Sequence, residues 1–379
     1  MLFDPGDELE FDTAGAHDSG GENEFTRRDF VKGAAAFTAS AVVSARLAMA
    51  RETRKTRRGG AAGSGGGSAA PAGGEIPRRP LGKTGVQVSA IGIGGYHLGS
   101  TKDQQEATEL CARAIDAGVN FFDNCWDYHD GLSEERMGTA LRGKRDQVVL
   151  MTKVCTHGRG KDVAMQMLEQ SLRRLQTDHL DVWQIHEVIY YNDPDLIFAP
   201  GGAAEALLAA KQQGKARFVG FTGHKDPAIH LRMLAQGFPF DTVQMPLNAF
   251  DASFRSFETQ VMPEANQRGI GVLGMKSLGG SGEMVAGGAI TAQEGLRYAM
   301  SLPVATTISG MDSLGVLEQN LEVARGFQPM SAAEMQALRE RVKVWAADGR
   351  YELFKTTKKY DGAVGREQHH YPTAQKLPA

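Results

Sequence analysis

The stretch that decides the fold is Gly118 to Gly131, with the sequence GVNFFDNCWDYHDG. It begins with a short apolar run, Val119 to Phe122, which is typical of a buried strand. The run then gives way to polar and titratable side chains, Asp123, Asn124, Asp127, His129 and Asp130. In α/β folds the chemistry is carried by such residues at the carboxyl ends of parallel strands. We therefore expect a parallel sheet whose strand ends meet at a functional site.

Two later apolar runs also end on a titratable residue. The run Val148 to Lys153 ends on a lysine, and Leu180 to His186 ends on a histidine. Successive parallel strands present their carboxyl ends at the same face of a sheet. Asp123, Tyr128, Lys153 and His186 are therefore expected to come together there.

These four residues, in this order and spacing, resemble the catalytic tetrad of the aldo-keto reductase family. The resemblance extends from about Arg79 to about Phe327 and implies a (β/α)8 TIM barrel. It also implies a nicotinamide-dependent oxidoreductase that reduces an aldehyde or ketone to an alcohol by hydride transfer. Tyr128 would be the general acid, with its pKa lowered by Lys153, which Asp123 would hold in place. His186 would orient the substrate oxygen.

The resemblance further implies NADP or NAD as the cofactor. Gln244 would contact the nicotinamide amide, and Met275 would cover the ring. The full set of expected cofactor-binding residues is Thr222, Gln244, Met275, Lys276, Ser277, Leu278, Gly310, Met311, Asp312, Gln319 and Asn320. Many relatives hold the 2′-phosphate of NADPH with a lysine and an arginine. By alignment these positions are Gly310 and Val316, so both charges are missing, and we expect NADH to bind at least as tightly as NADPH.

Two other functions fit the same residues. One is a non-catalytic module that binds the dinucleotide and senses redox state, which tight cofactor retention without turnover would indicate. The other is an isomerase or lyase on the same scaffold, which would be active without nicotinamide. For the reductase, the substrate is expected to be a small-molecule carbonyl compound bounded by the loop after His186.

Composition limits the classes of partner and of metal site. The net charge of −3, from 42 basic and 45 acidic residues, gives no reason to expect nucleic acid. The three cysteines, Cys111, Cys125 and Cys155, are an odd number and do not indicate a disulfide framework. A pairing of Cys125 with Cys155, or a metal site with His157, is conceivable. Because no spacing such as Cys-x-x-Cys is present, buried thiols are favoured and no metal is expected.

Residues 1–50 have the layout of a twin-arginine signal peptide behind an acidic lead. Arg27-Arg28 precede Phe30 and a weakly apolar segment, which ends at Ala48-Met-Ala50. This pattern predicts export to the periplasm by the Tat translocation machinery, with a basic amphipathic helix as the alternative. The apolar segment is shorter than the roughly 20 residues that span a bilayer, so no stable membrane insertion is expected.

The rest of the chain divides into a linker, a barrel and an extension. Residues 51–76 are basic and then rich in glycine, which is typical of a flexible linker. Residues 77–330 are expected to form the barrel, with a β-hairpin at 79–89 as a plug, and 331–379 to form a helix and a tail. Alternating patterns predict strands at 90–95, 217–221, 242–244, 271–274 and 305–308. They predict helices at 103–117, 133–141, 161–177, 201–213, 226–235, 254–267, 291–301, 313–324 and 332–345.

Overall fold

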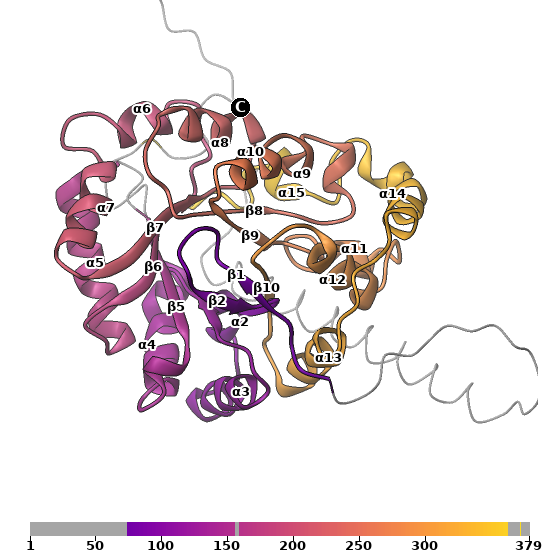
Figure 1. Cartoon of the computed structure of the whole chain (residues 1–379), viewed down its shortest axis with the longest axis horizontal. Coiled ribbons are helices and arrows are strands. Elements are labelled where there is room, and N and C mark those ends of the chain that lie inside the picture. The colour runs from indigo at the N-terminus through magenta and orange to yellow at the C-terminus, as the bar shows by residue number, and fades with distance from the viewer. Residues whose placement is uncertain (1–73, 156–158, 363–371, 373–379) are drawn as a thin grey trace, which may run out of the picture. The chain divides into compact units, whose positions relative to one another are not determined.

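The computed structural model describes residues 74–155, 159–362 and 372. Within them, eight parallel strands close into a barrel in the order β3 to β10, with β10 pairing back to β3 (Figure 1). The strands are β3 (Ile91–Gly94), β4 (Phe121–Asp123), β5 (Val149–Val154), β6 (Leu180–Ile185), β7 (Ala216–Thr222), β8 (Thr242–Pro246), β9 (Gly271–Met275) and β10 (Thr306–Gly310). The predicted TIM barrel is confirmed. The predicted signal peptide, and all of the predicted linker before Gly74, lie outside the described residues.

Helices follow most strands and cover the outside of the barrel. They are α2 (Gly95–Leu98), α3 (Gln104–Asp116), α4 (Leu132–Ala140), α5 (Lys161–Leu175), α6 (Asp193–Ile197), α7 (Ala203–Gln212), α8 (Pro227–Ala235), α9 (Phe257–Gln260), α10 (Met262–Gln267), α11 (Glu283–Ala286), α12 (Ala292–Ser301), α13 (Leu314–Ala324), α14 (Ala332–Ala346) and α15 (Leu353–Thr356). The expected helix at 254–267 is two short helices, α9 and α10. Pro263 has no N–H to continue a helical ladder, and α10 begins with it in its first turn.

Register between neighbouring strands brings the chemically important residues to one end of the barrel. Asp123 on β4 pairs with Met151 on β5, and Lys153 on β5 pairs with Gln184 on β6. On the other side of the barrel, Thr222 on β7 pairs with Gln244 on β8. Asp123, Lys153 and Thr222 lie at or near the carboxyl ends of their strands, and their partners Met151 and Gln244 lie in the middle of β5 and β8.

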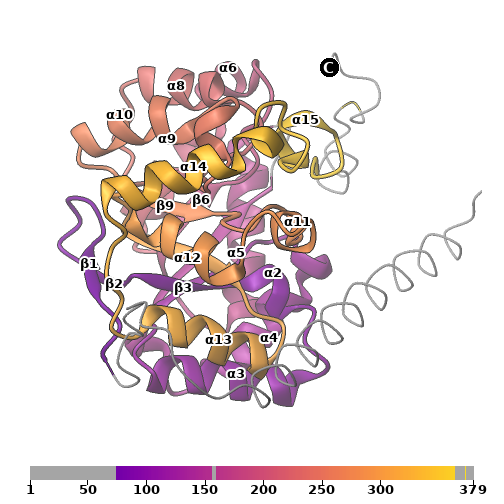
Figure 2. The same ribbon diagram turned by 90° about the vertical axis from the view of Figure 1, so that its right-hand side faces the viewer.

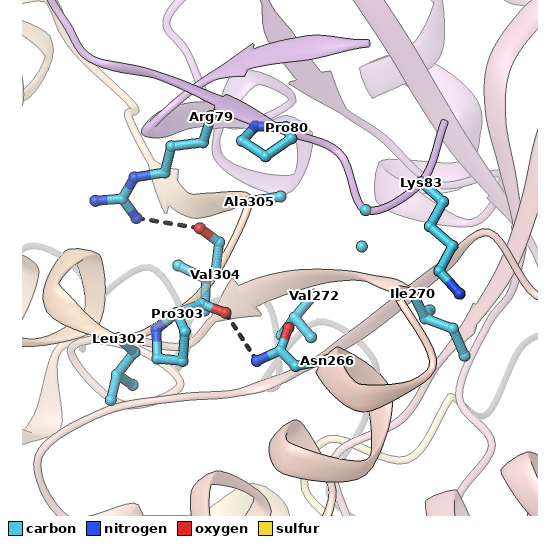
Figure 3. Close-up of a pocket in the computed structure, with 13 residues that line it drawn as sticks. Arg79, Pro80, Lys83, Asn266, Ile270, Val272, Leu302, Pro303, Val304 and Ala305 are labelled. Carbon is cyan, nitrogen blue, oxygen red and sulfur yellow. Dashed lines mark hydrogen bonds between the residues drawn. The ribbon is translucent and has the colours of Figure 1, made fainter. Parts of the chain in front are cut away.

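The amino end of the barrel is closed by an antiparallel hairpin, β1 (Arg78–Pro80) and β2 (Gln87–Ser89) (Figure 2). Leu81 and Val88 of the hairpin are fully buried in an apolar cluster with strand residues such as Phe121. Burying a side chain of this size stabilises the fold by about 1.5–3 kcal/mol. Arg79 donates to the carbonyl oxygens of Val304, at 3.1 Å, and Met300, at 2.6 Å. Figure 3 shows Arg79 at a pocket of about 370 Å³ between the hairpin and the barrel.

The carboxyl-terminal part of the chain returns to the opposite end of the barrel. α14 runs along the outside, and the segment from α15 to Gly362 crosses the end that carries the strand termini (Figure 2). Lys225 anchors this segment through an ion pair with Asp361 at 2.7 Å. The carboxyl-terminal segment thus lies over this end of the barrel as far as Gly362. Of the helices in the described part of the chain, none is long and apolar enough to cross a membrane.

Candidate active site

Asp123, Lys153 and Tyr128 form one hydrogen-bonded group at the carboxyl end of β4 and β5. Lys153 Nζ lies 2.5 Å from Asp123 Oδ1 and 3.4 Å from the Tyr128 hydroxyl. It also donates to the carbonyl oxygen of Asn124 at 2.7 Å. Asp123 and Lys153 are almost completely buried. Asp123 and Tyr128 line a pocket of about 660 Å³, and Lys153 does not. The lysine therefore forms the inner side of the site and the phenol faces the pocket.

Tyr128 is positioned by a sharp left-handed turn. It begins the 3₁₀ turn η1 (Tyr128–Gly131), in which His129 and Asp130 have φ of 53° and 56°. Positive φ costs little at Asp and His compared with bulkier residues, and Gly131, at φ 95°, completes the turn. The Tyr128 ring packs edge-on against Tyr96, with ring centroids 5.4 Å apart. The phenol is therefore held between a neighbouring ring and the lysine.

Electrostatics keep the Tyr128 phenol protonated. Burial, together with the nearby carboxylates of Asp123 and Asp127, raises the pKa of Tyr128 well above its usual value. Burial and these carboxylates therefore act against the lowering of the Tyr128 pKa that the sequence led us to expect from Lys153. Burial also raises the pKa of Asp123, and the ion pair with Lys153 opposes that shift. The arrangement supplies a protonated donor beside a fixed cation.

His186 follows β6 and completes the predicted tetrad. Its backbone N–H donates to the carbonyl oxygen of Val154 at 2.9 Å, which continues the parallel ladder by one residue. Its ring lies edge-on to Tyr128, with centroids 5.8 Å apart, and it lines the pocket. Its Nδ1 faces Cys125 Sγ at 3.1 Å and Cys155 Sγ at 3.0 Å. The structure thus brings all four predicted catalytic residues together, with two cysteines beside them.

Most of the predicted cofactor residues lie around the same pocket. Those that line it are Thr222, Met275, Lys276, Ser277, Leu278, Gly310 and Asp312. Met311 and Asn320 are buried behind the wall instead, and Asn320 donates to the Ser309 hydroxyl at 3.1 Å. Gln319, on α13, is not part of the lining either. The assignment of Gln319 and Asn320 to the cofactor therefore stays a prediction.

Gln244 lies beneath the pocket. Its Nε2 donates to Asp123 Oδ2 at 3.3 Å. Its Oε1 is buried and has no hydrogen-bond partner among the described residues. A buried acceptor left without a donor is costly, so this atom is suited to a ligand that brings an N–H group. A carboxamide is one such ligand.

A second part of the pocket carries groups suited to phosphate. Lys276 lies at the end of β9 with its Nζ 4.8 Å from the centre of the Tyr360 ring, and burial lowers its pKa to about 8. The glycine-rich loop 279–282 and the beginning of α13 border the same space. Backbone N–H groups at the start of an eleven-residue helix attract anions. The site therefore fits a dinucleotide at both the amide and the phosphate ends.

At one of the two positions where relatives carry a positive charge for the 2′-phosphate, this chain has no room for a side chain. A side chain at Gly310 would meet the His97 ring, with a Cβ only 2.1 Å from His97 Nδ1. Val316 lines the pocket and is uncharged. Lys355, in the carboxyl-terminal segment, is buried in ion pairs with Asp251 at 2.6 Å and Glu352 at 2.9 Å. Lys355 is therefore held away from the cofactor space, whereas Lys359 borders it.

Several lining residues were not predicted. Tyr96 and His97 come two and three residues after β3 ends, near the carboxyl end of a strand as Asp123 is, so this signal was available. Glu187 follows His186, and its Oε2 accepts a hydrogen bond from the Gly362 N–H at 2.9 Å. Tyr360 donates to Glu283 at 2.8 Å. The contacts from the tail join residues more than 70 positions apart, and no local pattern could indicate them.

Comparison with known proteins agrees with this geometry. The profile of the Aldo/keto reductase family matches residues 90–285. The chain is 31% identical over 208 residues to aldo-keto reductase YhdN of Bacillus subtilis, covering 51% of this chain and 59% of that protein. The chain thus spans about half to three-fifths of the length of the first curated relatives that it matches.

Solved structures show the same barrel. Aldo-keto reductase AKR11C1 from Bacillus halodurans superposes with a TM-score of 0.60 at 22% identity, covering 70% of this chain and 96% of that one. An aldo/keto reductase from Klebsiella pneumoniae, solved with NADP and acetate, has a TM-score of 0.58 at 25% identity. That match covers 72% of this chain and 96% of the other. With more than half of its length matched by the family profile, the chain belongs to the aldo/keto reductase family.

Proposed function

We propose that the protein reduces a small-molecule aldehyde or ketone to an alcohol with a nicotinamide dinucleotide, NADP or NAD. The observation that carries this proposal is the position of Lys153 Nζ, which joins Asp123 Oδ1 and the Tyr128 hydroxyl beside the pocket. A buried ion pair alone gives little net stability. A buried ion pair that ends on a protonated phenol facing a cavity is instead suited to proton transfer.

The residues divide the reaction between them. A bound dinucleotide would supply hydride, and the carbonyl oxygen, as it gains negative charge, would need a proton. Tyr128, protonated at neutral pH, donates that proton from its hydroxyl. The ammonium of Lys153 lies 3.4 Å from the phenol oxygen and stabilises the phenolate that results. His186 borders the same space and orients the carbonyl oxygen.

The chain's own residues also support the binding of the dinucleotide. Gln244 Oε1 would accept the nicotinamide amide, and Met275 would cover the ring face. Lys276 and the N-terminal end of α13 would hold the phosphates. Binding of NADP by the relative from Klebsiella pneumoniae is consistent with this assignment.

The direct test is a screen of carbonyl compounds with NADH and with NADPH, followed by the absorbance of the reduced nicotinamide. We expect consumption of the cofactor only when a carbonyl compound is present. Tight retention of the dinucleotide, with no turnover of any aldehyde or ketone, would contradict the reductase and favour a redox-sensing module. Full conversion of a substrate without nicotinamide would instead identify an isomerase or lyase.

We also propose that residues 1–50 are a twin-arginine signal peptide, that 51–76 are a linker, and that the protein is exported to the periplasm. The support is the Arg27-Arg28 pair before Phe30 and the Ala48-Met-Ala50 end. Replacing Arg27 and Arg28 by lysine should leave the folded, uncleaved precursor in the cytoplasm. Cell fractionation checks this, and unchanged periplasmic accumulation of the double variant would contradict it.

A further inference from the structure

Four side chains of metal-ligating type, His186 among them, lie close together. Cys125 follows β4, Cys155 follows β5, and Asp127 and His186 complete the group. One potential ligand atom from each residue lies within 4.8 Å of all the others. The two Sγ atoms are 3.4 Å apart, and His186 Nδ1 lies 3.1 Å from Cys125 Sγ and 3.0 Å from Cys155 Sγ.

Asp127 is the independent indication that this group is built for a ligand. Its Oδ1 lies 3.8 Å from His186 Nδ1. The same oxygen is buried and has no conventional hydrogen bond to any residue that the structure describes. A buried carboxylate oxygen without a donor is costly unless a cation satisfies it. Here the unsatisfied oxygen faces two thiols and an imidazole nitrogen.

The separations suit a tetrahedral ion. With bonds of about 2.3 Å to sulfur and about 2.0 Å to nitrogen, a tetrahedral Zn²⁺ spaces two sulfur ligands by about 3.8 Å and sulfur and nitrogen by about 3.5 Å. The observed distances are shorter by about half an ångström or less. Binding of the ion therefore requires side-chain adjustments of about this size.

We propose that Cys125, Cys155, His186 and Asp127 bind a thiophilic divalent cation of the Zn²⁺ class. Thiolate and imidazole ligands select such ions over Mg²⁺ and Ca²⁺, which prefer oxygen. Binding replaces both S–H protons by bonds to the metal, and the protons are released to solvent. The proposal does not depend on the reductase activity, because it rests only on the four ligands.

The ion reaches this site from the pocket. Cys125 and Cys155 are fully buried, whereas the side chains of His186 and Asp127 are 11% and 19% exposed and line the cavity. Four protein ligands leave no open position, which is typical of structural rather than catalytic zinc. The ion would hold the His186 ring through Nδ1 and so fix its orientation towards the pocket. The predicted absence of a metal came from the missing Cys-x-x-Cys spacing, but here the two cysteines come from neighbouring strands instead.

Titration of the metal-free protein with Co²⁺, in the presence of a phosphine reductant, tests the site. We expect one equivalent to bind, with the intense thiolate-to-metal band and the d–d bands of tetrahedral Co²⁺, and Zn²⁺ to displace it. Cys125→Ser and Cys155→Ser should each weaken binding by more than the 10–100-fold that outer-shell partners typically contribute. Cys111→Ser is the matched control, since Cys111 is also buried but lies on α3, and it should bind like the wild type.

A second measurement covers the case in which a cysteine variant fails to fold. Asp127→Asn keeps the shape of a partly exposed side chain and should weaken Co²⁺ binding at least tenfold, with circular dichroism confirming the fold. Zinc should also raise the melting temperature of the wild type and of Cys111→Ser but not of the ligand variants. Co²⁺ binding without a thiolate band, or binding that survives both the cysteine and the Asp127 substitutions, would overturn the proposal.

Discussion

Two buried lysines, Lys153 and Lys355, lie at the same end of the molecule and have similar partners. Lys153 contacts Asp123 at 2.5 Å and the carbonyl oxygen of Asn124 at 2.7 Å. Lys355 contacts Asp251 at 2.6 Å and the carbonyl oxygen of Phe254 at 2.8 Å. The two lysines are thus alike in their burial, and each contacts one carboxylate and one backbone carbonyl oxygen.

The two sites differ in the third hydrogen-bond partner of each lysine. Glu352 gives Lys355 a second carboxylate, at 2.9 Å, and neither residue lines the pocket beside the tetrad. Lys153 has a phenol at 3.4 Å that does line it. A buried lysine–carboxylate pair is therefore not by itself a sign of catalysis. The sign is a protonated group that the lysine can stabilise and a substrate can reach.

The largest expected effect is on Tyr128. Tyr128→Phe should lower kcat/KM by about 10²–10⁴-fold, the usual contribution of a general acid, while dinucleotide affinity stays nearly constant. The matched control is Tyr298→Phe, which removes another buried phenol; it donates to Glu258 at 2.7 Å and does not line the pocket. The control should lose stability but keep its turnover. If Tyr128→Phe retained more than about a tenth of the wild-type kcat/KM, the assignment of the general acid would fail.

Lys355→Met should have the opposite signature. It leaves Asp251 and Glu352 buried without a cation, which typically costs about 3–5 kcal/mol of unfolding free energy. Kcat/KM of the folded enzyme should not change, because Lys355 does not border the pocket. Urea unfolding and steady-state kinetics separate the two effects. A loss of turnover with unchanged stability would mean that the two lysines had been distinguished wrongly.

The pH dependence sharpens this second test. Burial raises the pKa of Glu352 to about 7, so the folded state binds its proton more tightly than the unfolded chain, where 4.5 is usual. The contribution of Glu352 to stability is therefore present below about pH 4.5 and is lost as the pH rises through about 7. Removing Lys355 strengthens this tendency. The deficit of Lys355→Met relative to the wild type should be larger at pH 8 than at pH 5.

Much of the fold follows from local sequence. A strand such as β3 contains only isoleucine and glycine and is buried along its whole length, and helices such as α5 have amphipathic periodicity. The short helices α2, α6, α11 and α15 were not predicted, because four or five residues carry no helical period. The break between α9 and α10 was signalled by Pro263, and the prediction overlooked it.

The site was predictable only in part. Asp123, Lys153 and His186 could be identified because each interrupts or ends an apolar strand. The pKa of Tyr128 could not, since it depends on burial and on Asp127, which a sequence does not place. The two buried cysteines beside His186 come from neighbouring strands. Tyr360 makes its contacts from the distant tail. Such contacts are set by tertiary packing.

A third lysine, Lys276, lines the pocket, and its charge is expected to depend on pH. Burial lowers its pKa to about 8, so the ammonium is present at pH 7 and is lost as the pH rises through about 8. If it binds cofactor phosphate, dinucleotide affinity should fall between pH 7 and 9.5. Lys276→Met should remove this dependence and weaken binding at pH 7 by about ten- to a hundredfold. Fluorescence titrations check this, with Lys343→Met as control, since Lys343 is exposed on α14 and does not line the pocket. A pH dependence that persists in Lys276→Met would exclude Lys276.

The smallest expected effect concerns the choice between NADH and NADPH. Since Gly310 is closed by His97 and Lys355 is held in ion pairs, Val316 is the position at which one new cation could reach a 2′-phosphate. The wild type should bind NADH at least as tightly as NADPH. Val316→Lys should raise the affinity for NADPH relative to NADH by about tenfold, the value of one charge-assisted hydrogen bond, whereas Val316→Met should not. Parallel fluorescence titrations of both cofactors decide it. A strong preference of the wild type for NADPH that survives Lys359→Met would show that the barrel holds the phosphate through other residues.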